Sequence, residues 1–342
     1  MNYKLLGKSG LKVSEICLGT MGFGQEWKWG ADKEMSFEIL KAFTDAGGNF
    51  IDTANRYTEG TSEKFIGEFI RGNRDHFVIA TKYSLFDNQS NPNASGNNRK
   101  NMMRSVEESL RRLQTDCIDL LYLHIWDQLT PIEEVMRGLD DLVRAGKVHY
   151  VGISDTPAWI ISKGQTLSEL MGWSKFVALQ VEYSLLQRTP ERELLPMAEH
   201  FGMSLCNWAP LAGGALTGKY LKGEKGRLPE GSKRLNERSE SVTRVILKIA
   251  EETGWAPAHI ALAWCRQQYA SCMPIVGATK TAQLIENMGF LKVHLGAEHM
   301  QQLNDVSHIE LGFPGDFYKE EGVKAVNFGG FYDRIEHPRV QP

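Results

Sequence analysis

The chain has 342 residues, of which 42% are hydrophobic and 24% are charged, proportions typical of a globular protein with a sizeable core. Its length fits one large α/β barrel or two ordinary domains. The formal net charge of −3 gives no basic excess, which argues against nucleic acid or an anionic membrane as a partner.

The N-terminal sequence and the cysteines favour a cytoplasmic protein. The segment from Met1 to Gly7 lacks the apolar core and the cleavage site of a signal peptide. The longest apolar run, near residues 118–126, is far too short to cross a membrane. Five cysteines occur without a CxxC pair, which favours reduced thiols. We therefore expect a cytoplasmic chain without a membrane partner, and no pattern reveals its oligomeric state.

Short apolar segments alternate with longer amphipathic segments along most of the chain. Eight short segments are predicted to be strands: Ile16–Leu18, Asn49–Ile51, Phe77–Thr81, Ile118–Leu123, Val148–Ile153, Val177–Gln180, Ser204–Trp208 and Met273–Val276. Intervening segments predicted to be helices include Lys33–Ala46, Lys100–Leu113, Ile132–Ala145 and Arg192–Phe201. In Lys100–Leu113, apolar residues recur every three or four positions from Met103 to Leu113, which places them on one helix face.

Eight strand–helix units predict an α/β fold of the closed (β/α)8, or TIM, barrel type. The continuously apolar strands suit a parallel sheet that is covered on both faces. The alternative is a doubly wound open sheet, which usually carries a glycine-rich turn directly after its first strand. Here residues 19–24 read Gly-Thr-Met-Gly-Phe-Gly, and this glycine spacing does not match. We therefore predict a single barrel domain over residues 1–342.

Segments outside the repeating units add an N-terminal β-hairpin and three insertions. Residues 4–6 and 11–13, joined by a turn at residues 7–10, predict a hairpin that covers the bottom of the barrel. Residues 87–98 and 223–239 are predicted to be long loops. The C-terminal tail after Ile309 is aromatic and lacks clear periodicity. We predict that this tail is irregular and closes over the mouth of the barrel.

Ionisable residues stand at the ends of three consecutive predicted strands. Asp52 closes the second strand, Lys82 follows the third, and His124 ends the fourth. The carboxyl ends of barrel strands converge on one face, where barrel enzymes carry out their chemistry. Tyr57 lies in the loop that begins at Asp52 and is near enough to fold back over it. We therefore predict that these four side chains form a catalytic cluster.

The segments that carry these residues resemble the aldo-keto reductase family. They are Asp52–Tyr57 with Gly60 and Ser62-Glu63, Ile79–Lys82, Asp119–His124, and Gly146–Val148 with Gly152–Ser154. The resemblance extends from about Lys4 to Asn287. Ser154–Trp159 and His124–Asp127 are most similar to the bacterial and fungal aryl-alcohol dehydrogenase branch. The resemblance implies an oxidoreductase that reduces aldehydes or ketones, aryl aldehydes among them, by hydride transfer from a nicotinamide cofactor.

The chemistry of carbonyl reduction explains the four residue types. Hydride addition leaves an alkoxide, which Tyr57 would protonate as the general acid. A free tyrosine has a pKa of about 10 and is a poor acid at neutral pH. Lys82 would lower that pKa by stabilising the tyrosinate, and Asp52 would keep Lys82 charged and oriented. His124 would donate a hydrogen bond to the carbonyl oxygen.

The resemblance also implies residues that bind the nicotinamide end of the cofactor. Ser154 and Gln180 match positions that bind its carboxamide. Asp155 stands where the family often has Asn, and a carboxylate can only accept a hydrogen bond from the amide nitrogen. Trp208 stands where the family commonly stacks a Tyr on the nicotinamide ring, and an indole can replace that ring.

The pyrophosphate loop is expected after the seventh strand. Its candidate residues are Pro210, Leu211, Gly213, Gly214 and Lys219. Small residues there would let backbone N–H groups approach phosphate oxygens. Residues 213–219 also fit most of a nucleotide-triphosphatase P-loop. Tyr220 occupies the position of its magnesium-binding Ser or Thr, so we reject that alternative.

The adenosine end is expected after the eighth strand. The residues that match the family are Gly277, Thr279, Lys280, Gln283, Glu286 and Asn287. Lys280 would neutralise a 2′-phosphate and therefore favours NADPH over NADH as the cofactor. No paired Cys/His spacing is present, and hydride transfer from nicotinamide requires no metal.

The expected substrate is a small carbonyl compound in a pocket walled by aromatic side chains. The candidates for this wall are Trp27, Trp29, Phe86 and Trp126. Two alternatives to a reductase remain. One is a cofactor-binding regulatory barrel, similar to the subunits of this family that modulate a membrane channel. The other is a Schiff-base aldolase that uses Lys82 as its nucleophile.

Overall fold

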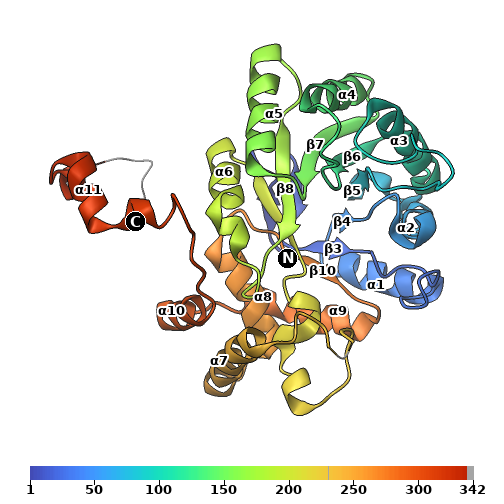
Figure 1. Cartoon of the computed structure of the whole chain (residues 1–342). Coiled ribbons are helices and arrows are strands. Elements are labelled where there is room, and N and C mark those ends of the chain that lie inside the picture. The colour runs from blue at the N-terminus through green and yellow to red at the C-terminus, as the bar shows by residue number, and fades with distance from the viewer. Residues whose placement is uncertain (230, 337–342) are drawn as a thin grey trace.

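A ring of helices surrounds an eight-stranded parallel sheet in the computed structural model, which describes residues 1–229 and 231–336 (Figure 1). The strands are β3 (Cys17–Gly19), β4 (Phe50–Asp52), β5 (Val78–Tyr83), β6 (Ile118–Leu123), β7 (Val148–Ser154), β8 (Phe176–Glu182), β9 (Ser204–Trp208) and β10 (Ile275–Gly277). Their hydrogen-bonded order runs from β10 through β3 to β9. A parallel bridge between Leu205 and Cys272 joins the two edges, with the Met273 amide donating to the Leu205 carbonyl at 2.8 Å. The sheet therefore closes, and the predicted (β/α)8 barrel is confirmed.

The helices of the ring follow the strands in turn. They are α1 (Lys33–Asp45), α2 (Thr61–Ile70), α3 (Arg99–Leu113), α4 (Ile132–Arg144), α5 (Ala158–Met171), α6 (Leu194–Phe201), α7 (Glu237–Thr253), α8 (Pro257–Gln268), α9 (Thr281–Met288) and α10 (Ala297–Val306). In α3 the Asn98 side chain caps the first turn by accepting from the Asn101 amide, and the buried face begins at Met102. The predicted face is therefore right from Val106 to Leu113, but Met102 rather than Met103 begins it. In the part of the chain that is described, no helix is both long and apolar enough to cross a membrane.

Alternation along the strands divides the buried residues into two layers. One set packs between the strands and the helices, and the other fills the barrel interior. The interior set includes Phe50 on β4, Val78 and Ala80 on β5, and Leu120 and Tyr122 on β6. Side chains at every second position of a strand share one face. The next inward-facing position along each of these strands therefore lies above the apolar interior, at the carboxyl end of the barrel.

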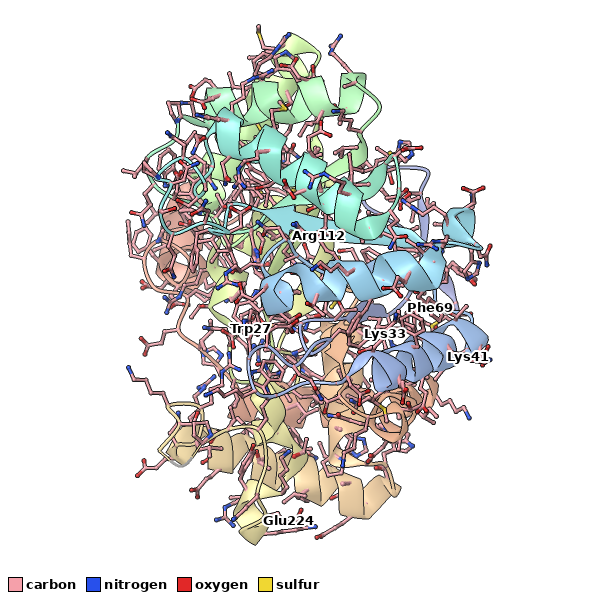
Figure 2. All side chains as sticks on the ribbon, turned by 90° about the vertical axis from the view of Figure 1, so that its right-hand side faces the viewer. Trp27, Lys33, Lys41, Phe69, Arg112 and Glu224 are labelled. Carbon is pink, nitrogen blue, oxygen red and sulfur yellow. The ribbon has the colours of Figure 1, made fainter. Side chains whose placement is uncertain are left out.

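A buried glutamate fixes the helices beside β5. Glu63 on α2 is fully buried and accepts from the Thr81 hydroxyl and from Arg112 Nε, both at 2.6 Å. Figure 2 shows Arg112 beside α2, with Trp27 near the end where α2 begins and Phe69 toward its other end. A buried carboxylate needs such partners because an unpaired charge is costly to desolvate. This contact anchors β5 directly beside Lys82.

The hairpin of β1 (Tyr3–Leu5) and β2 (Lys12–Ser14) covers the amino-terminal end of the barrel. Leu6 and Val13 are fully buried among the interior residues, and Lys4 Nζ donates to the Cys272 carbonyl at 2.9 Å. Gly7 has a φ of +56°, and a Cβ there would lie 2.2 Å from the Val177 carbonyl oxygen. Only glycine fits that approach. The predicted hairpin is therefore present, and its contacts place it as the expected plug.

The C-terminal tail differs from its prediction. It contains the helix α11 (Glu321–Phe328) and two short turns of 3-10 helix, η7 (Phe317–Lys319) and η8 (Tyr332–Arg334). At its base, the backbone oxygens of His308 and Glu310 accept from Arg238 and Arg192 at 3.0 and 2.9 Å. Beyond them the tail extends away from the helix ring (Figure 1). The expectation that the tail closes over the mouth is wrong, because its aromatic rings pair with one another instead.

Candidate active site

The carboxyl ends of the strands bring the predicted catalytic residues together. Lys82 follows Val78 and Ala80 on the inward face of β5, and Asp52 follows Phe50 on β4. The ammonium of Lys82 donates to Asp52 Oδ2 at 2.6 Å and to the Thr53 carbonyl at 2.7 Å. It also lies 3.2 Å from the Tyr57 hydroxyl. Lys82 lies within β5 rather than after it, and three groups satisfy its ammonium.

A strained turn holds Tyr57 over Lys82. Tyr57 begins the 3-10 turn η1 (Tyr57–Gly60), in which Thr58 and Glu59 have φ values of +48° and +56°. Non-glycine residues rarely adopt this left-handed backbone, and such strain persists where the surroundings impose it. The Thr58 hydroxyl provides one such contact by donating to the Phe23 carbonyl. The turn therefore directs the Tyr57 ring inward, with Lys82 Nζ 4.8 Å from the ring centre.

Burial and charge act in opposite directions on this pair. Burial alone would lower the pKa of Lys82, but Asp52 and Tyr57 raise it above its ordinary value, so Lys82 is an ammonium. Burial raises the pKa of Tyr57 above its ordinary value, and Lys82 opposes that rise only in part. Lys82 acts on the Tyr57 pKa in the predicted direction, but the net shift in the free protein is upward. Desolvation outweighs the ammonium, and the phenol retains its proton.

His124 lies directly after β6, where its ring meets the Tyr57 ring edge-on with centroids 5.9 Å apart. Burial, and then the charge of Lys82, hold the pKa of His124 well below its ordinary value. The imidazole is therefore neutral at pH 7 and carries one N–H donor. Its Nδ1 is buried and has no hydrogen-bond partner among residues 1–229 and 231–336. A buried polar atom of this kind is available to a ligand.

The nicotinamide-site candidates surround this cluster. Gln180 Nε2 donates to Asp52 Oδ1 at 2.8 Å, which leaves the amide oxygen of Gln180 as an acceptor for another group. Ser154 is buried at the end of β7. Asp155 follows it with a φ of +38° and accepts from Trp208 Nε1 at 3.3 Å. The carboxyl-terminal parts of β7, β8 and β9 thus carry all four candidates on the side of the barrel that holds the catalytic residues.

The predicted pyrophosphate loop after β9 turns at two consecutive glycines with left-handed backbone. Gly213 and Gly214, in the turn η4 (Ala212–Thr217), have φ values of +71° and +94°. A Cβ on Gly214 would lie 3.2 Å from Lys219 Nζ, so the predicted ammonium sits against the glycine pair. The Gly214 N–H donates to the Leu211 carbonyl at 2.8 Å, so the Lys219 side chain is the cationic group beside this turn. Pro210 is buried and Leu211 partly buried, and both hold the start of this loop.

The adenosine-site candidates extend from the end of β10 through the turn before α9 to the last turn of that helix. Lys280 is the N-cap residue of this helix and is exposed together with Gly277, Gln283 and Glu286. The Thr279 amide donates to Gln283 Oε1 at 3.2 Å, whereas Asn287 is buried. Thr279 also approaches the barrel mouth, because a Cβ on Gly22 would lie 3.2 Å from its methyl group. These residues are the ones that would hold the adenosine end of a nucleotide cofactor.

The basic residues of the 223–239 loop were not among the predicted site residues. Arg234 donates to Glu182 Oε1 at 2.6 Å, and its Nη1 would lie 3.4 Å from a Cβ on Gly213. A cavity of about 190 Å³ opens there between Glu182, Ala212, Lys233, Arg234 and Arg238. The cluster of Lys and Arg in residues 219–238 was the available signal, but only the fold shows that this loop returns to the glycine pair.

The predicted aromatic wall separates into two parts. The Trp27 ring meets the Tyr57 ring edge-on at 6.5 Å and neighbours Trp29 at 6.2 Å. Phe86 lies under the Arg56 guanidinium at 4.6 Å and is 39% exposed. Trp126 is partly buried against the main core, although its amide bonds to the Asp155 carbonyl at 3.4 Å. The Trp27 ring therefore packs against the ring of Tyr57, whereas Phe86 is exposed to solvent.

A closed barrel with this cluster at the carboxyl end of its strands has the architecture of a barrel oxidoreductase. A family model described as the aldo/keto reductase family matches residues 15–308. The chain belongs to the aldo/keto reductase family. It is accordingly an oxidoreductase that uses a nicotinamide cofactor and acts on carbonyl and alcohol groups.

Curated relatives align with nearly the whole chain. An aryl-alcohol dehydrogenase [NADP(+)] of Phanerodontia chrysosporium is 41% identical, over 89% of this chain and 85% of its own length. A norsolorinic acid reductase of Aspergillus flavus is 38% identical, over 94% and 84%. A putative aryl-alcohol dehydrogenase of Saccharomyces cerevisiae is 38% identical, over 91% and 88%. These relatives confirm the predicted resemblance to the aryl-alcohol dehydrogenase branch.

Proposed function

We propose that this protein reduces aldehydes and ketones, aryl aldehydes among them, to alcohols with NADPH, and that Tyr57 is the general acid. The observation that carries the proposal is the buried ammonium of Lys82, which contacts both Asp52 and the Tyr57 hydroxyl. A phenol that keeps its proton beside a fixed positive charge is poised to protonate an alkoxide. The aryl-alcohol dehydrogenases among the relatives support the substrate class.

The bound nicotinamide would supply the hydride. The chain's own residues would stabilise and then protonate the oxygen on which negative charge develops. The neutral His124 would donate a hydrogen bond to the carbonyl oxygen and place it beside the Tyr57 hydroxyl. Tyr57 would give its proton to that oxygen. Lys82 would stabilise the resulting tyrosinate at 3.2 Å, and Asp52 would hold the ammonium in place. A proton from solvent would then restore the phenol.

The basic residues along the nucleotide path support NADPH over NADH. Lys219 lies at the glycine pair, and Lys280 is exposed at the start of α9. A 2′-phosphate is the group that distinguishes the two cofactors, and an exposed ammonium at a helix N-terminus suits it. The name of the Phanerodontia relative includes NADP(+). The five unpaired cysteines, most of them buried, also suit the reducing cytoplasm that we propose as its location.

The Schiff-base alternative conflicts with the state of Lys82. An amine must lose its proton to attack a carbonyl, whereas Asp52 and Tyr57 raise the pKa of this buried lysine. Three oxygen partners also surround Lys82 Nζ. The regulatory-barrel alternative has no particular observation in its favour.

Titration of tryptophan fluorescence with NADPH and with NADH tests the proposal. Trp208, bonded to Asp155 beside the catalytic residues, would report a nicotinamide ring against it. We expect saturable quenching with both nucleotides and tighter binding of NADPH, followed by turnover of aromatic aldehydes. Folded protein that responds to neither nucleotide would overturn the cofactor site.

Replacement of Lys280 by Ala should weaken NADPH binding by about three- to fivefold, the upper end of the effect of losing one exposed charge pair. NADH affinity should change by less than about twofold, because NADH lacks the 2′-phosphate. Lys292→Ala is a matched control, since Lys292 is also exposed and belongs to η6 (Gly289–Lys292), just after α9. Equal losses for both nucleotides would show that Lys280 does not contact the 2′-phosphate.

A further inference from the structure

Asp155 is a carboxylate without a positive partner of its own at the catalytic end of the barrel. The charged and titratable groups that face it are Lys82 on β5, Glu182 on β8 and Tyr57 in η1. Lys82 is paired with Asp52, and Glu182 is paired with Arg234. No salt bridge to Asp155 occurs in the described part of the chain. The neighbouring cations are therefore paired with other carboxylates, and the negative charge of Asp155 is not compensated by an ion pair.

Two hydrogen bonds fix where this carboxylate lies. The Asp155 amide donates to the Gln180 carbonyl at 3.3 Å, and its Oδ1 accepts from Trp208 Nε1 at 3.3 Å. Gln180 in turn contacts Asp52 at 2.8 Å. The Asp155 carboxylate thus lies beside the Trp208 indole and within electrostatic reach of Lys82 and Tyr57, where the proposed function places the nicotinamide. The strained backbone, with a φ of +38°, shows that the surroundings determine this position.

We propose that the Asp155 carboxylate makes the site favour the oxidised nicotinamide nucleotide over the reduced one, and that protonation of Asp155 removes this preference. The inference rests on the proposed function, because it requires the nicotinamide to lie beside Trp208. The oxidised ring carries a positive charge and the reduced ring is neutral, so a nearby carboxylate stabilises only the former. An Asn at this position would provide similar hydrogen bonds without this discrimination.

The sign of the pH dependence follows from the state of the carboxylate. Burial raises the pKa of Asp155 to about 6, although the Trp208 N–H and Lys82 oppose the rise. Above this value Asp155 is ionised and the oxidised nucleotide gains affinity. Below it the carboxyl is neutral and the two nucleotides differ less. Acidic conditions would therefore favour carbonyl reduction, and alkaline conditions alcohol oxidation, through binding alone.

The ratio of two dissociation constants measures this effect apart from turnover. NADPH binding is followed by the nucleotide's own fluorescence, and NADP⁺ binding by displacement of NADPH. Both are measured between about pH 5 and 8. The 2′-phosphate is common to both nucleotides, so its titration cancels in the ratio. We expect the ratio Kd(NADPH)/Kd(NADP⁺) to rise roughly tenfold with increasing pH in the native protein.

Three variants separate the carboxylate from its surroundings. Asp155→Asn should hold the ratio near its acidic value at every pH. Trp208→Phe keeps an aromatic ring but removes the N–H that favours the ionised form, so the transition should move to higher pH. Glu251→Gln, a carboxylate-to-amide change at an exposed residue of α7 outside the proposed site, should leave the ratio and its transition unchanged.

The possible outcomes distinguish a failure of the role of Asp155 from a failure of the proposed function. A pH-independent ratio in the native protein, or a transition that persists in Asp155→Asn, would overturn the role of Asp155 and leave the reductase proposal intact. If Asp155→Asn does not fold, an unshifted transition in Trp208→Phe would overturn the inference in the same way. A native protein that binds neither nucleotide would overturn the proposed function itself.

Discussion

Replacement of Tyr57 by Phe should lower kcat for aldehyde reduction by about 10³- to 10⁴-fold, at the upper end of what a general acid contributes. The substitution removes the hydroxyl that lies 3.2 Å from Lys82 Nζ and leaves an alkoxide without its proton donor. NADPH affinity should stay within about twofold of the native value, because the hydroxyl acts on the substrate oxygen. Stopped-flow measurement of NADPH oxidation and a binding titration test the two parts separately.

The variant should remain folded. Lys82 keeps its bonds to Asp52 and Thr53 after the hydroxyl is lost, so the expected destabilisation is about 1–2 kcal/mol, the size of one lost hydrogen bond. Tyr318→Phe in the exposed tail is a matched control and should be neutral in both assays. Near-native turnover in Tyr57→Phe would assign the proton donor to another group. Loss of NADPH binding would instead give Tyr57 a structural role.

The strand pattern was sufficient to predict the barrel and the position of the catalytic residues. The predicted limits of Ile118–Leu123 and Ser204–Trp208 are those of β6 and β9, and the other barrel strands are displaced by one or two residues at their ends. These strands are apolar and short, so periodicity and turn residues define them together. Parallel barrel strands end on one face. Correct assignment of the strands was therefore enough to predict that Asp52, Lys82 and His124 lie close together.

Features that depend on three-dimensional surroundings could not be predicted in the same way. The net shift in the pKa of Tyr57 depends on how strongly burial desolvates its hydroxyl. The spacing of residues in the sequence does not give this quantity. Arg234 reaches Glu182 and Gly213 only because the 223–239 loop folds back. The direction of the tail beyond Glu310 depends on a few arginine contacts at its base. Its aromatic composition alone suggested a lid.

Replacement of Asp52 by Asn should destabilise the fold by about 3–5 kcal/mol, the usual consequence of leaving a buried charge without its counterion. Lys82 is fully buried, and Asp52 is 3% exposed. The variant would retain a hydrogen-bond acceptor for Lys82 Nζ but not the negative charge that raises its pKa. Urea denaturation measures the loss. Asp45→Asn on the exposed pair with Lys41 is the control and should cost less than about 1 kcal/mol.

The double variant Asp52→Asn with Lys82→Met distinguishes a stability role from a catalytic one. Removing both charges should recover most of the stability lost in Asp52→Asn, because a neutral pair carries no desolvation cost. Turnover should not recover, since the Tyr57 hydroxyl would then lack the ammonium at 3.2 Å that stabilises its anion. Recovery of both properties would mean that the pair serves the fold alone. Recovery of stability without turnover would show that the site retains a buried ion pair, at a cost in stability, for its effect on Tyr57.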